Sequence, residues 1–184
     1  GKSAVNIKYY ADSNNLKLDI QQGNIDVAHR SLTATDIESL KKEGKVNIVD
    51  GPGGELRYLV FNLDTMPYGA KDKTPDAAKA LAIRQAVAHS IDRQAISDNV
   101  FKGTYTPLFG FVPDGQAGAG TVLKSMFGDG SGKPDAAKAK AVLTAAGVTT
   151  PVTLNIQYTS DHYGPSSGDE YAAIKSQLEA TGLF

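Results

Sequence analysis

The stretch from residue 54 to residue 113 constrains the fold more than any other part of the chain. It opens with an alternation typical of a β-strand, at Leu56, Tyr58, Val60 and Asn62. After Pro75, apolar residues recur every three or four positions and predict a helix with one buried face: Ala80, Ile83, Val87 and Ile91. Asp92 then stands where a second helix needs an N-cap, and Gly103 ends that helix. The order of one strand and two helices indicates layered α/β structure.

The flanking segments repeat this alternation of strands and helices. Further strands are predicted at residues 5–10, 25–28, 46–48 and 152–156. Further helices are predicted from Asp12-Ser13 to Gly23, from Thr33 or Thr35 to Gly44, from Pro134 to Gly147, and from Tyr171 to Gly182. Residues 104–133 are rich in Gly, Pro and aromatic residues and are expected to form a long ordered loop. The predicted fold class is therefore α/β.

The composition argues against several classes of partner. Hydrophobic residues make up 41% of the 184 residues, charged residues make up 21%, and the net charge is -1, as in a soluble globular protein. Nineteen Lys and Arg are spread among twenty Asp and Glu, so nucleic acid is not an expected ligand. No apolar run approaches the roughly 20 residues that span a bilayer. The absence of cysteine excludes disulfides and thiolate metal sites.

Motifs that suggest a cofactor or catalysis fail on spacing. Residues 128–133 resemble a phosphate loop, but Phe127 stands in place of its first glycine and Pro134 in place of the magnesium-binding hydroxyl residue. We interpret this segment as a mobile linker capped by proline. The three histidines are far apart, no nucleophile elbow occurs, and acidic residues at helix starts complement the helix dipole. No cofactor, metal site or catalytic residue is therefore predicted.

Short motifs occur along nearly the whole chain, and their order is more informative than any one of them. They are residues 18–27, Leu32-Thr33 to Asp36-Ile37, Tyr58-Leu59 with Phe61-Asn62, Arg84-Gln85-Ala86, Ile91-Asp92-Arg93, Gly103 with Pro107, Val112-Pro113, and residues 135–147. In this order they resemble the extracytoplasmic solute-binding proteins of peptide and nickel ABC transporters, family 5. The family's leader, the first half of its N-terminal lobe and its later C-terminal segment have no counterpart here, so we interpret the sequence as a partial chain.

The resemblance implies a periplasmic-binding-protein type II-like fold of two α/β lobes that close over a ligand by a hinge. Residues 1–62 are expected to belong to the N-terminal lobe and to end in the crossover strand between lobes, and residues 63–184 to the C-terminal lobe. The implied function is non-covalent capture of a peptide or similar solute outside the cytoplasmic membrane, followed by delivery to a membrane permease. Contact with the membrane is expected only through that permease or through a lipid anchor missing from this chain.

Four residues are proposed to bind the ligand. Asn62 is either a hinge residue whose amide bridges the lobes or the residue that ends a strand. Tyr105, Phe109 and Phe111 are expected to line the cleft, because aromatic rings offer contact area at low entropic cost, and ordinary loop packing is the alternative. Arg84 is expected to pair with a carboxylate such as that of Asp92.

Two other classes of function remain open. A sensory or chaperone-like module would use the same fold and couple to a partner protein instead of a permease. A hydrolase would require several carboxylate, serine or histidine side chains within hydrogen-bonding reach in the cleft. The ligand class also stays open, because peptides, nickel complexes and sugars all use this scaffold.

Overall fold

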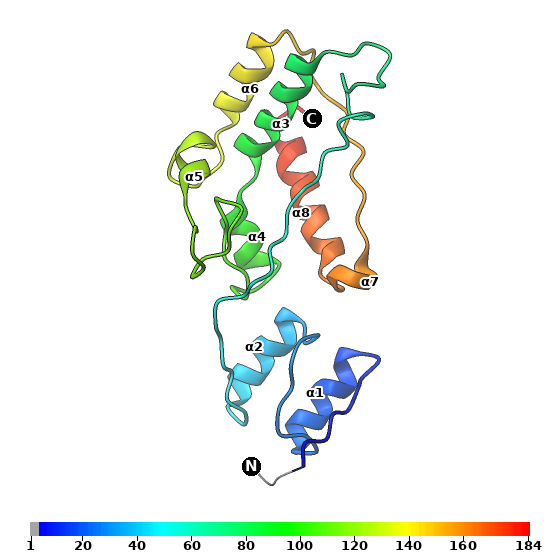
Figure 1. Ribbon diagram of the computed structural model, residues 1–184, viewed down its shortest axis with the longest axis vertical. Coiled ribbons are helices and arrows are strands. Elements are labelled where there is room, and N and C mark those ends of the chain that lie inside the picture. The colour runs from blue at the N-terminus through cyan, green and yellow to red at the C-terminus, as the bar shows by residue number, and fades with distance from the viewer. Residues whose placement is uncertain (1–3) are drawn as a thin grey trace. The chain divides into compact units, whose positions relative to one another are not determined.

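A computed structural model describes residues 4–184, and within that range it contains eight helices and no paired β-strand. The chain divides into two compact units, the first ending at Asp50 and the second running from Gly51 to Phe184. Figure 1 labels the helices of each unit and colours them by their position along the chain. No helix in the described part is both long and apolar enough to cross a membrane.

The first unit contains two helices whose ends match the sequence prediction. Helix α1 (Ser13–Gln22) begins after Asp12, whose carboxylate accepts the backbone N–H of Asn15, and ends at Gly23 with φ 73°. Helix α2 (Ala34–Glu43) begins with a capping box, in which Thr33 and Asp36 each accept the other's backbone N–H. The apolar side chains buried in this unit are Leu16, Ala34 and Leu40.

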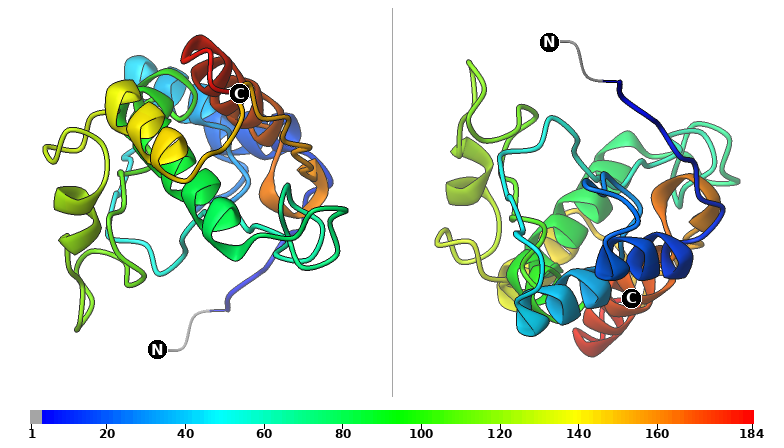
Figure 2. Two further views of the ribbon diagram at one scale, coloured as in Figure 1. Left: turned by 90° about the horizontal axis from the view of Figure 1, so that it is seen from above. Right: turned by 90° about the horizontal axis from the view of Figure 1, so that it is seen from below.

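The core of the second unit lies between α3 (Ala77–Ser90) and α6 (Ala136–Ala145). These helices lie side by side in Figures 1 and 2. Their contact uses small residues together with larger ones: Ala86 and Ala139 are fully buried beside Ile83 and Leu143. Small side chains let the two backbones approach closely, and the larger ones fill the remaining space.

Capping groups fix where these two helices begin. Asp76 accepts the backbone N–H groups of Ala78 and Lys79, which starts α3 as predicted. Asp135 accepts the N–H of Lys138, and its own N–H donates to the carbonyl of His89 at 2.7 Å. The N-cap of α6 is therefore Asp135. The prediction that Pro134 occupies the first helical position is wrong by two residues, since α6 begins at Ala136.

The last helix, α8 (Ser167–Ala180), packs on the end of α3. Ile174 and Leu178 of α8 form a second apolar cluster with Val87 and Ile91. The side chain of Gln177 bonds to both the N–H and the carbonyl of Asp92, which is the N-cap of α4 (Arg93–Asn99). The helix restart predicted at Asp92 is thus confirmed.

Two short helices lie outside the predicted set. Helix α5 (Val122–Met126) interrupts the stretch 104–133 that was expected to be a loop, and α7 (Ser160–Tyr163) precedes α8. Helix α8 itself begins at Ser167, before the predicted start at Tyr171. Helices this short carry too little periodic pattern to be read from a sequence.

The predicted strands at 5–10, 25–28, 46–48, 56–62 and 152–156 are not confirmed. All five segments are extended or irregular, and none forms a ladder with another segment in residues 4–184. An alternating pattern specifies which side chains share a face, but a strand also needs a neighbour for its backbone groups. Side chains in the segment 56–62 still point alternately inward and outward: Leu59 and Phe61 pack against the two apolar clusters, while Tyr58 and Val60 are exposed. The α/β class is therefore not confirmed for the described residues.

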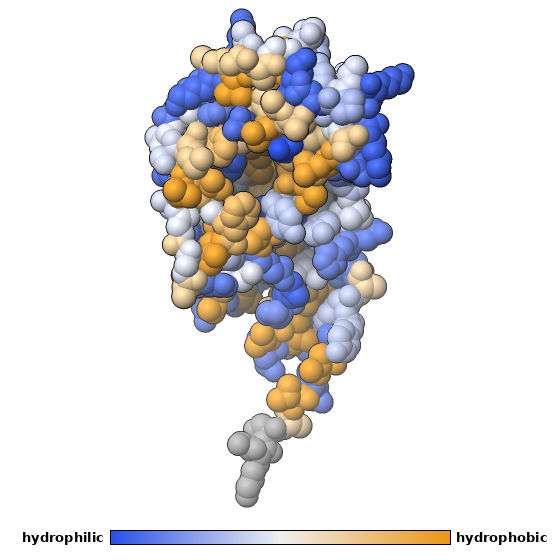
Figure 3. Space-filling view, turned by 45° about the horizontal axis from the view of Figure 1, so that its top comes forward, coloured by the Kyte–Doolittle hydropathy of each residue, from blue (hydrophilic) through white to orange (hydrophobic). Residues whose placement is uncertain are grey.

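Apolar residues also reach the surface elsewhere. On the face shown in Figure 3 they lie in several separate groups among polar and charged residues. Scattered exposed apolar side chains are ordinary in folded proteins, so this pattern alone marks no binding surface.

Candidate ligand-binding site

Polar and aromatic side chains from three segments of the second unit converge on Arg57. Its Nε donates to both carboxylate oxygens of Glu170, at 3.2 and 3.0 Å, and its Nη2 donates to the same carboxylate. Its Nη1 donates to the carbonyl of Tyr163 at 3.0 Å, and Nη2 also donates to the hydroxyl of the fully buried Ser167 at 3.1 Å. All three guanidinium nitrogens are therefore engaged within the protein.

Three aromatic rings surround this guanidinium. The centres of the Phe101, Tyr105 and Tyr163 rings lie 5.4, 5.8 and 5.7 Å from its central carbon. These distances are within the range of cation–π attraction. The Phe101 and Tyr105 rings also contact each other, with centres 4.3 Å apart. We call the set Arg57, Phe101, Tyr105, Tyr163, Ser167 and Glu170 the Arg57 cluster.

The electrostatics of the Arg57 cluster favour the charged form of Arg57. The hydrogen-bonded carboxylate of Glu170 raises the pKa of Arg57 above its ordinary value, and partial burial opposes this rise. Both side chains are largely shielded, with exposed fractions of 18% for Arg57 and 12% for Glu170. Water therefore screens this pair less than it screens an ion pair on an open surface.

Local structure brings each member into place. Arg57 shares a face of its extended segment with Leu59 and Phe61, and those two residues pack into the apolar clusters, so Arg57 also points inward. On the opposite side, the turn after α4 is closed by Thr104, whose hydroxyl donates to the Phe101 carbonyl at 2.6 Å. The hydroxyl of Ser97 donates to the Tyr105 carbonyl. These bonds fix the two aromatic residues relative to α4.

Of the four residues proposed to bind ligand, Tyr105 lies in the Arg57 cluster. Tyr105 is 45% exposed, so part of the residue remains accessible to solvent. Phe109 lies instead beside Arg93 and Lys124, whose charged groups are 5.5 and 5.6 Å from its ring centre. Phe111 is 84% exposed. Among the described residues no ring contact joins Phe109 or Phe111 to the Arg57 cluster.

Asn62 makes a local turn at the end of its extended segment. Its side-chain oxygen accepts the backbone N–H groups of Asp64 and Thr65 at 3.0 and 3.2 Å. Its carbonyl accepts the N–H of Met66 at 2.9 Å. These bonds are those of a residue that ends a segment. A hinge role for Asn62 stays a prediction.

The pairing expected for Arg84 is wrong. Its guanidinium donates to the sulfur of Met66 at 3.6 Å, and no carboxylate within residues 4–184 pairs with it. The carboxylate of Asp92 accepts the N–H of Ala95 at 2.9 Å and serves as a helix cap. Capping and ion pairing compete for the same oxygens, and the nearer backbone group is bound here.

The segment 128–133 is a closed turn instead of an open linker. The carboxylate of Asp129 accepts the N–H and hydroxyl of Ser131, at 2.7 and 2.8 Å, and the N–H of Lys133 at 3.1 Å. These hydrogen bonds, led by that of the Ser131 hydroxyl, lower the pKa of Asp129. The backbone donors that a phosphate loop would turn toward its anion are thus bound by the protein's own carboxylate.

The three histidines differ in environment. His29 and His162 are exposed, whereas His89 is buried, with its ring edge against Phe127 and its Nδ1 accepting the N–H of Gly128 at 2.9 Å. His89 is thus a buried packing residue of α3. In the described part of the chain, no three His, Asp or Glu side chains are grouped so as to hold a metal ion.

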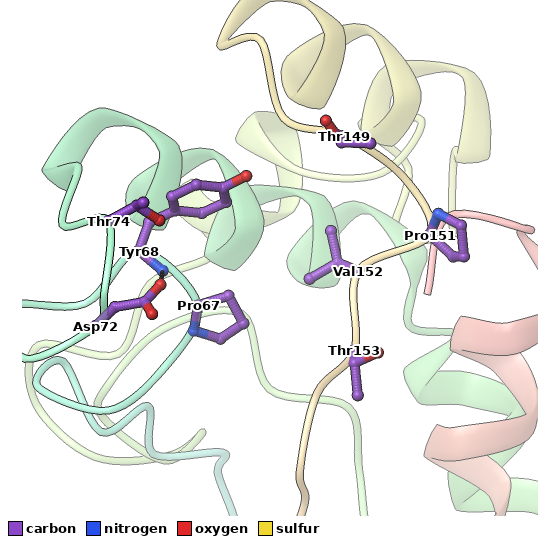
Figure 4. Close-up of a pocket in the computed structure, with 8 residues that line it drawn as sticks. All are labelled: Pro67, Tyr68, Asp72, Thr74, Thr149, Pro151, Val152 and Thr153. Carbon is purple, nitrogen blue, oxygen red and sulfur yellow. Dashed lines mark hydrogen bonds between the residues drawn. The ribbon is translucent and has the colours of Figure 1, made fainter.

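Two open recesses indent the second unit. One, of about 330 Å³, lies between residues 67–74 and 149–153, and Figure 4 shows Tyr68 and Asp72 facing Val152 and Thr153 across it. The N–H of Tyr68 donates to the Asp72 carboxylate at 2.5 Å. The other, of about 440 Å³, is lined by Ser90, Asp92, Ala95, Pro134, Ala136, Gln177, Ala180 and Thr181. Neither recess contains a predicted ligand-binding residue.

Comparison with known proteins places the chain in a family. Residues 3–183 match the bacterial extracellular solute-binding proteins, family 5, in the part described as the middle of the family. The chain belongs to this family, as the order of its motifs indicated. No solved structure matches it significantly.

Several relatives are named for peptide binding. The chain is 27% identical over 180 residues to a probable D,D-dipeptide-binding periplasmic protein of Escherichia coli K12. The aligned region covers 98% of this chain and 31% of the relative. It is 28% identical to an oligopeptide-binding protein of Streptococcus pneumoniae, over 90% of this chain and 25% of the relative. It is also 28% identical to a di/tripeptide-binding protein of Pseudomonas aeruginosa, over 72% of this chain and 22% of the relative. The chain therefore spans about a third or less of the length of these relatives.

Arg57, Tyr163 and Glu170 were not among the residues predicted from the sequence to form the site. Glu170 was interpreted as one of the acids that complement a helix start, and Tyr163 lies in a helix too short to be predicted. Arg57 carried a usable signal, because alternation places it on the same face as Leu59 and Phe61. A charge on a face that packs inward requires a counter-charge, and that requirement would have prompted a search for an acidic partner.

Proposed function

We propose that this chain is part of the substrate-binding component of an ABC transporter, which captures a peptide or similar small solute and delivers it to a membrane permease. The observation that carries the proposal is the family match across residues 3–183. The peptide-binding names of three relatives from different bacteria support a peptide as the ligand. The family's description as extracellular supports a location outside the cytoplasmic membrane.

In this proposal the Arg57 cluster presents aromatic surface to the ligand. Tyr105 and Tyr163 are 45% and 58% exposed, and Tyr58 on the outer face of the adjoining segment is 69% exposed. Aromatic rings give a large contact area with few rotatable bonds, which suits ligands with varied side chains. Arg57 already uses its donors within the protein, so its role is to position these rings. Binding is non-covalent, and the protein performs no chemical step.

The proposed architecture is a type II-like α/β fold of two lobes, with residues 1–62 in the N-terminal lobe and residues 63–184 in the C-terminal lobe. Exposed apolar residues at alternate positions support strands that pair with further chain: Val5, Ile7 and Tyr9 are 85%, 74% and 90% exposed. Hydrogen exchange, measured on the full-length protein that the host organism produces (the host-length protein), tests whether these strands are paired. Slow exchange at residues 5–9 and 58–60 supports paired strands, and fast exchange at both contradicts them.

Delivery requires that the ligand stabilise one state of the protein over another. A ligand shifts an open form to a closed form only by binding the closed form more tightly, so both lobes must contact it. The closed form is then the state that a permease recognises. A fragment that lacks half of one lobe is expected to bind peptide weakly or not at all.

Calorimetric titration of the host-length protein with mixed di- and tripeptides tests the proposal. Tyr105→Ala and Tyr163→Ala are expected to weaken peptide binding by roughly tenfold each, since each removes an aromatic contact worth about 1 kcal/mol or more. Leu81→Ala is the matched control, because Leu81 on α3 is as exposed as Tyr105 and lies outside the cluster. Equal affinities in all three variants would assign the ligand contact to other residues. No binding of any peptide by the unaltered protein would refute the proposed function.

A further inference from the structure

The segment 121–134, which contains α5, is attached to the helical core chiefly through Gly128. Within the described residues, the hydrogen bonds between this segment and α3 or α6 all involve that glycine. The N–H of Gly128 donates to Nδ1 of His89 on α3, and its carbonyl accepts from the ammonium of Lys138 on α6, both at 2.9 Å. None of the described residues 121–134 belongs to either apolar cluster. In Figure 2, α5 and its flanking loops lie to one side of the α3–α6 pair.

The point of attachment is closely packed. The Phe127 ring meets the His89 ring edge to face, with centres 5.3 Å apart and planes at 67°. Gly128 is buried with φ 63°, and a Cβ added there would collide with the carbonyl of Lys133. Only glycine therefore lets the backbone N–H reach His89 in this turn.

The turn that follows Gly128 is held by its own hydrogen bonds. The carboxylate of Asp129 accepts the N–H groups of Ser131 and Lys133, and the N–H of Asp129 donates to the Lys133 carbonyl at 2.9 Å. At the far end, the N–H of Asp135 donates to the backbone carbonyl of His89, a bond that does not use the imidazole. The segment can therefore leave the core as one piece while α6 keeps its start.

The bond from Gly128 depends on the charge state of His89. Because Nδ1 accepts a hydrogen bond, the neutral ring carries its proton on Nε2. A proton added at Nδ1 replaces the acceptor by a donor, so the Gly128 N–H loses its partner. Two charged groups face the ring, both from α6. Burial and then Lys138 lower the pKa of His89, and Asp135 partly opposes them.

We propose that His89 is a pH-sensitive latch, which holds the segment 121–134 against α3 and α6 while its ring is neutral and releases the segment when the ring is protonated. In the open form the ring lies in water and binds a proton more readily than in the closed form. The closed form is therefore fully favoured above pH 6.5 and is lost as the pH falls through the pKa of the buried ring. The N–H of Leu123 on α5 donates to the Phe109 carbonyl at 3.3 Å, so release also loosens the loop that contains Phe109.

Hydrogen exchange of the host-length protein, followed by mass spectrometry between pH 8 and pH 4.5, tests the latch. After correction for the intrinsic pH dependence of exchange, protection of residues 121–134 is expected to fall by up to about tenfold per pH unit between pH 6.5 and the folded pKa of His89. Peptides from α3 and α6 are expected to keep their protection. Exchange of the imidazole C2–H in the same samples reports when His89 becomes protonated.

Three outcomes would overturn the latch. Protection of residues 121–134 that persists after His89 is protonated would show that the ring does not hold the segment. A parallel loss of protection in α3 and α6 would show unfolding of the core instead of local release. A His89 ring that stays neutral down to pH 4.5 would remove the trigger.

Two variants assign the effect to named groups. His89→Asn offers an acceptor that does not titrate, so protection of residues 121–134 is expected to vary less with pH. Lys138→Met keeps His89 in place and removes the bond to the Gly128 carbonyl, so protection at pH 8 is expected to fall. Lys140→Met is the matched control, because Lys140 is exposed on the same helix and no contact joins it to Gly128. An acid response of His89→Asn equal to that of the unaltered protein, or equal protection in the two lysine variants, would contradict the proposal.

Discussion

Arg57 and Glu170 lie 113 residues apart in the chain and form a two-pronged ion pair that ties an extended segment to the first turn of α8. The pair is enclosed by Phe101, Tyr105 and Tyr163. A fixed charge pair at the centre of three rings holds those rings in one arrangement. Under the proposed function, holding these rings in place is the role of the pair.

Arg57→Met is expected to lower the free energy of unfolding of the second unit by about 1–3 kcal/mol, because it leaves the shielded carboxylate of Glu170 without its partner. Glu170→Gln is expected to cost less, since the amide oxygen still accepts from Arg57. Urea denaturation measures both. The control is Lys175→Met, which removes an exposed pair with Glu179 and is expected to cost less than about 0.5 kcal/mol. Equal losses for Arg57→Met and Lys175→Met would show that the Arg57–Glu170 pair contributes no more to the free energy of unfolding than an exposed ion pair does.

His89 is expected to make the second unit less stable in mild acid. Burial, reinforced by Lys138 and partly opposed by Asp135, lowers the pKa of His89 below 6.5. The unfolded chain then binds the proton more readily, so stability is complete above pH 6.5 and is lost as the pH falls from there through the folded pKa. Protonation at Nδ1 would also remove the acceptor for the Gly128 N–H.

Unfolding measured at several values between pH 5 and pH 8 tests this pH dependence. His89→Asn keeps an acceptor near the Nδ1 position and does not titrate, so the loss of stability below pH 6.5 is expected to shrink. Replacement of the exposed His29 and His162 by Gln is the control and is expected to leave the loss unchanged. An unchanged loss in His89→Asn would assign the acid sensitivity to other groups.

Gly128→Ala is expected to be much more damaging than Gly130→Ala. Both glycines have positive φ, 63° and 87°, so both substitutions carry the backbone strain of about 1–2 kcal/mol. A Cβ at Gly128 would also lie 2.0 Å from the carbonyl oxygen of Lys133, whereas the nearest atom at Gly130 is 3.8 Å away. The clash is expected to add roughly 2 kcal/mol or more. Thermal unfolding of the two variants gives the comparison, and equal losses would contradict the closed turn at 128–133.

Asp19 is expected to titrate well below an ordinary aspartate. Its carboxylate accepts from Lys8, from the Tyr10 hydroxyl at 2.6 Å and from Asn24 at 3.1 Å, and these bonds, led by that of Lys8, lower its pKa to about 2. Because the folded pKa is depressed, the stabilisation is present above pH 3.8 and is lost as the pH falls toward 2. Carboxyl carbon NMR during an acid titration measures the midpoint. Lys8→Met is expected to raise it, and a midpoint near 3.8 in the unaltered protein would contradict the three bonds.

Helix starts and stops were predictable because their chemistry is local. Asp12, Thr33 and Asp92 each accept a backbone N–H within the next three residues, and Gly23 and Gly44 each adopt the left-handed conformation that ends a helix. The buried side of α3 was likewise visible in the spacing of Ile83 and Val87. Interactions of this kind are complete within a few residues of sequence.

The strands and most of the site depend on distant residues, and sequence reasoning failed there. The alternation at 56–62 grouped Tyr58 with Val60 on one face but did not say which face packs inward, and in the structure Leu59 packs inward while Tyr58 is exposed. A ladder also needs a second segment that the pattern does not name. In the same way, Tyr105 was predicted to line the ligand cleft from its own segment, whereas Arg57 and Tyr163, which complete its cluster, come from parts of the chain far from it. Which residues meet across such distances is a property of packing.

Native mass spectrometry of the host-length protein, purified gently and without added ligand, tests the central claim most directly. We predict that it carries a distribution of co-purified small peptides, that these dissociate unmodified on gentle activation, and that a peptide supplied in excess replaces them. Unmodified release distinguishes capture from hydrolysis. A protein that stays empty through a panel of peptides, or that releases only cleaved peptides, would contradict capture of a peptide for transport.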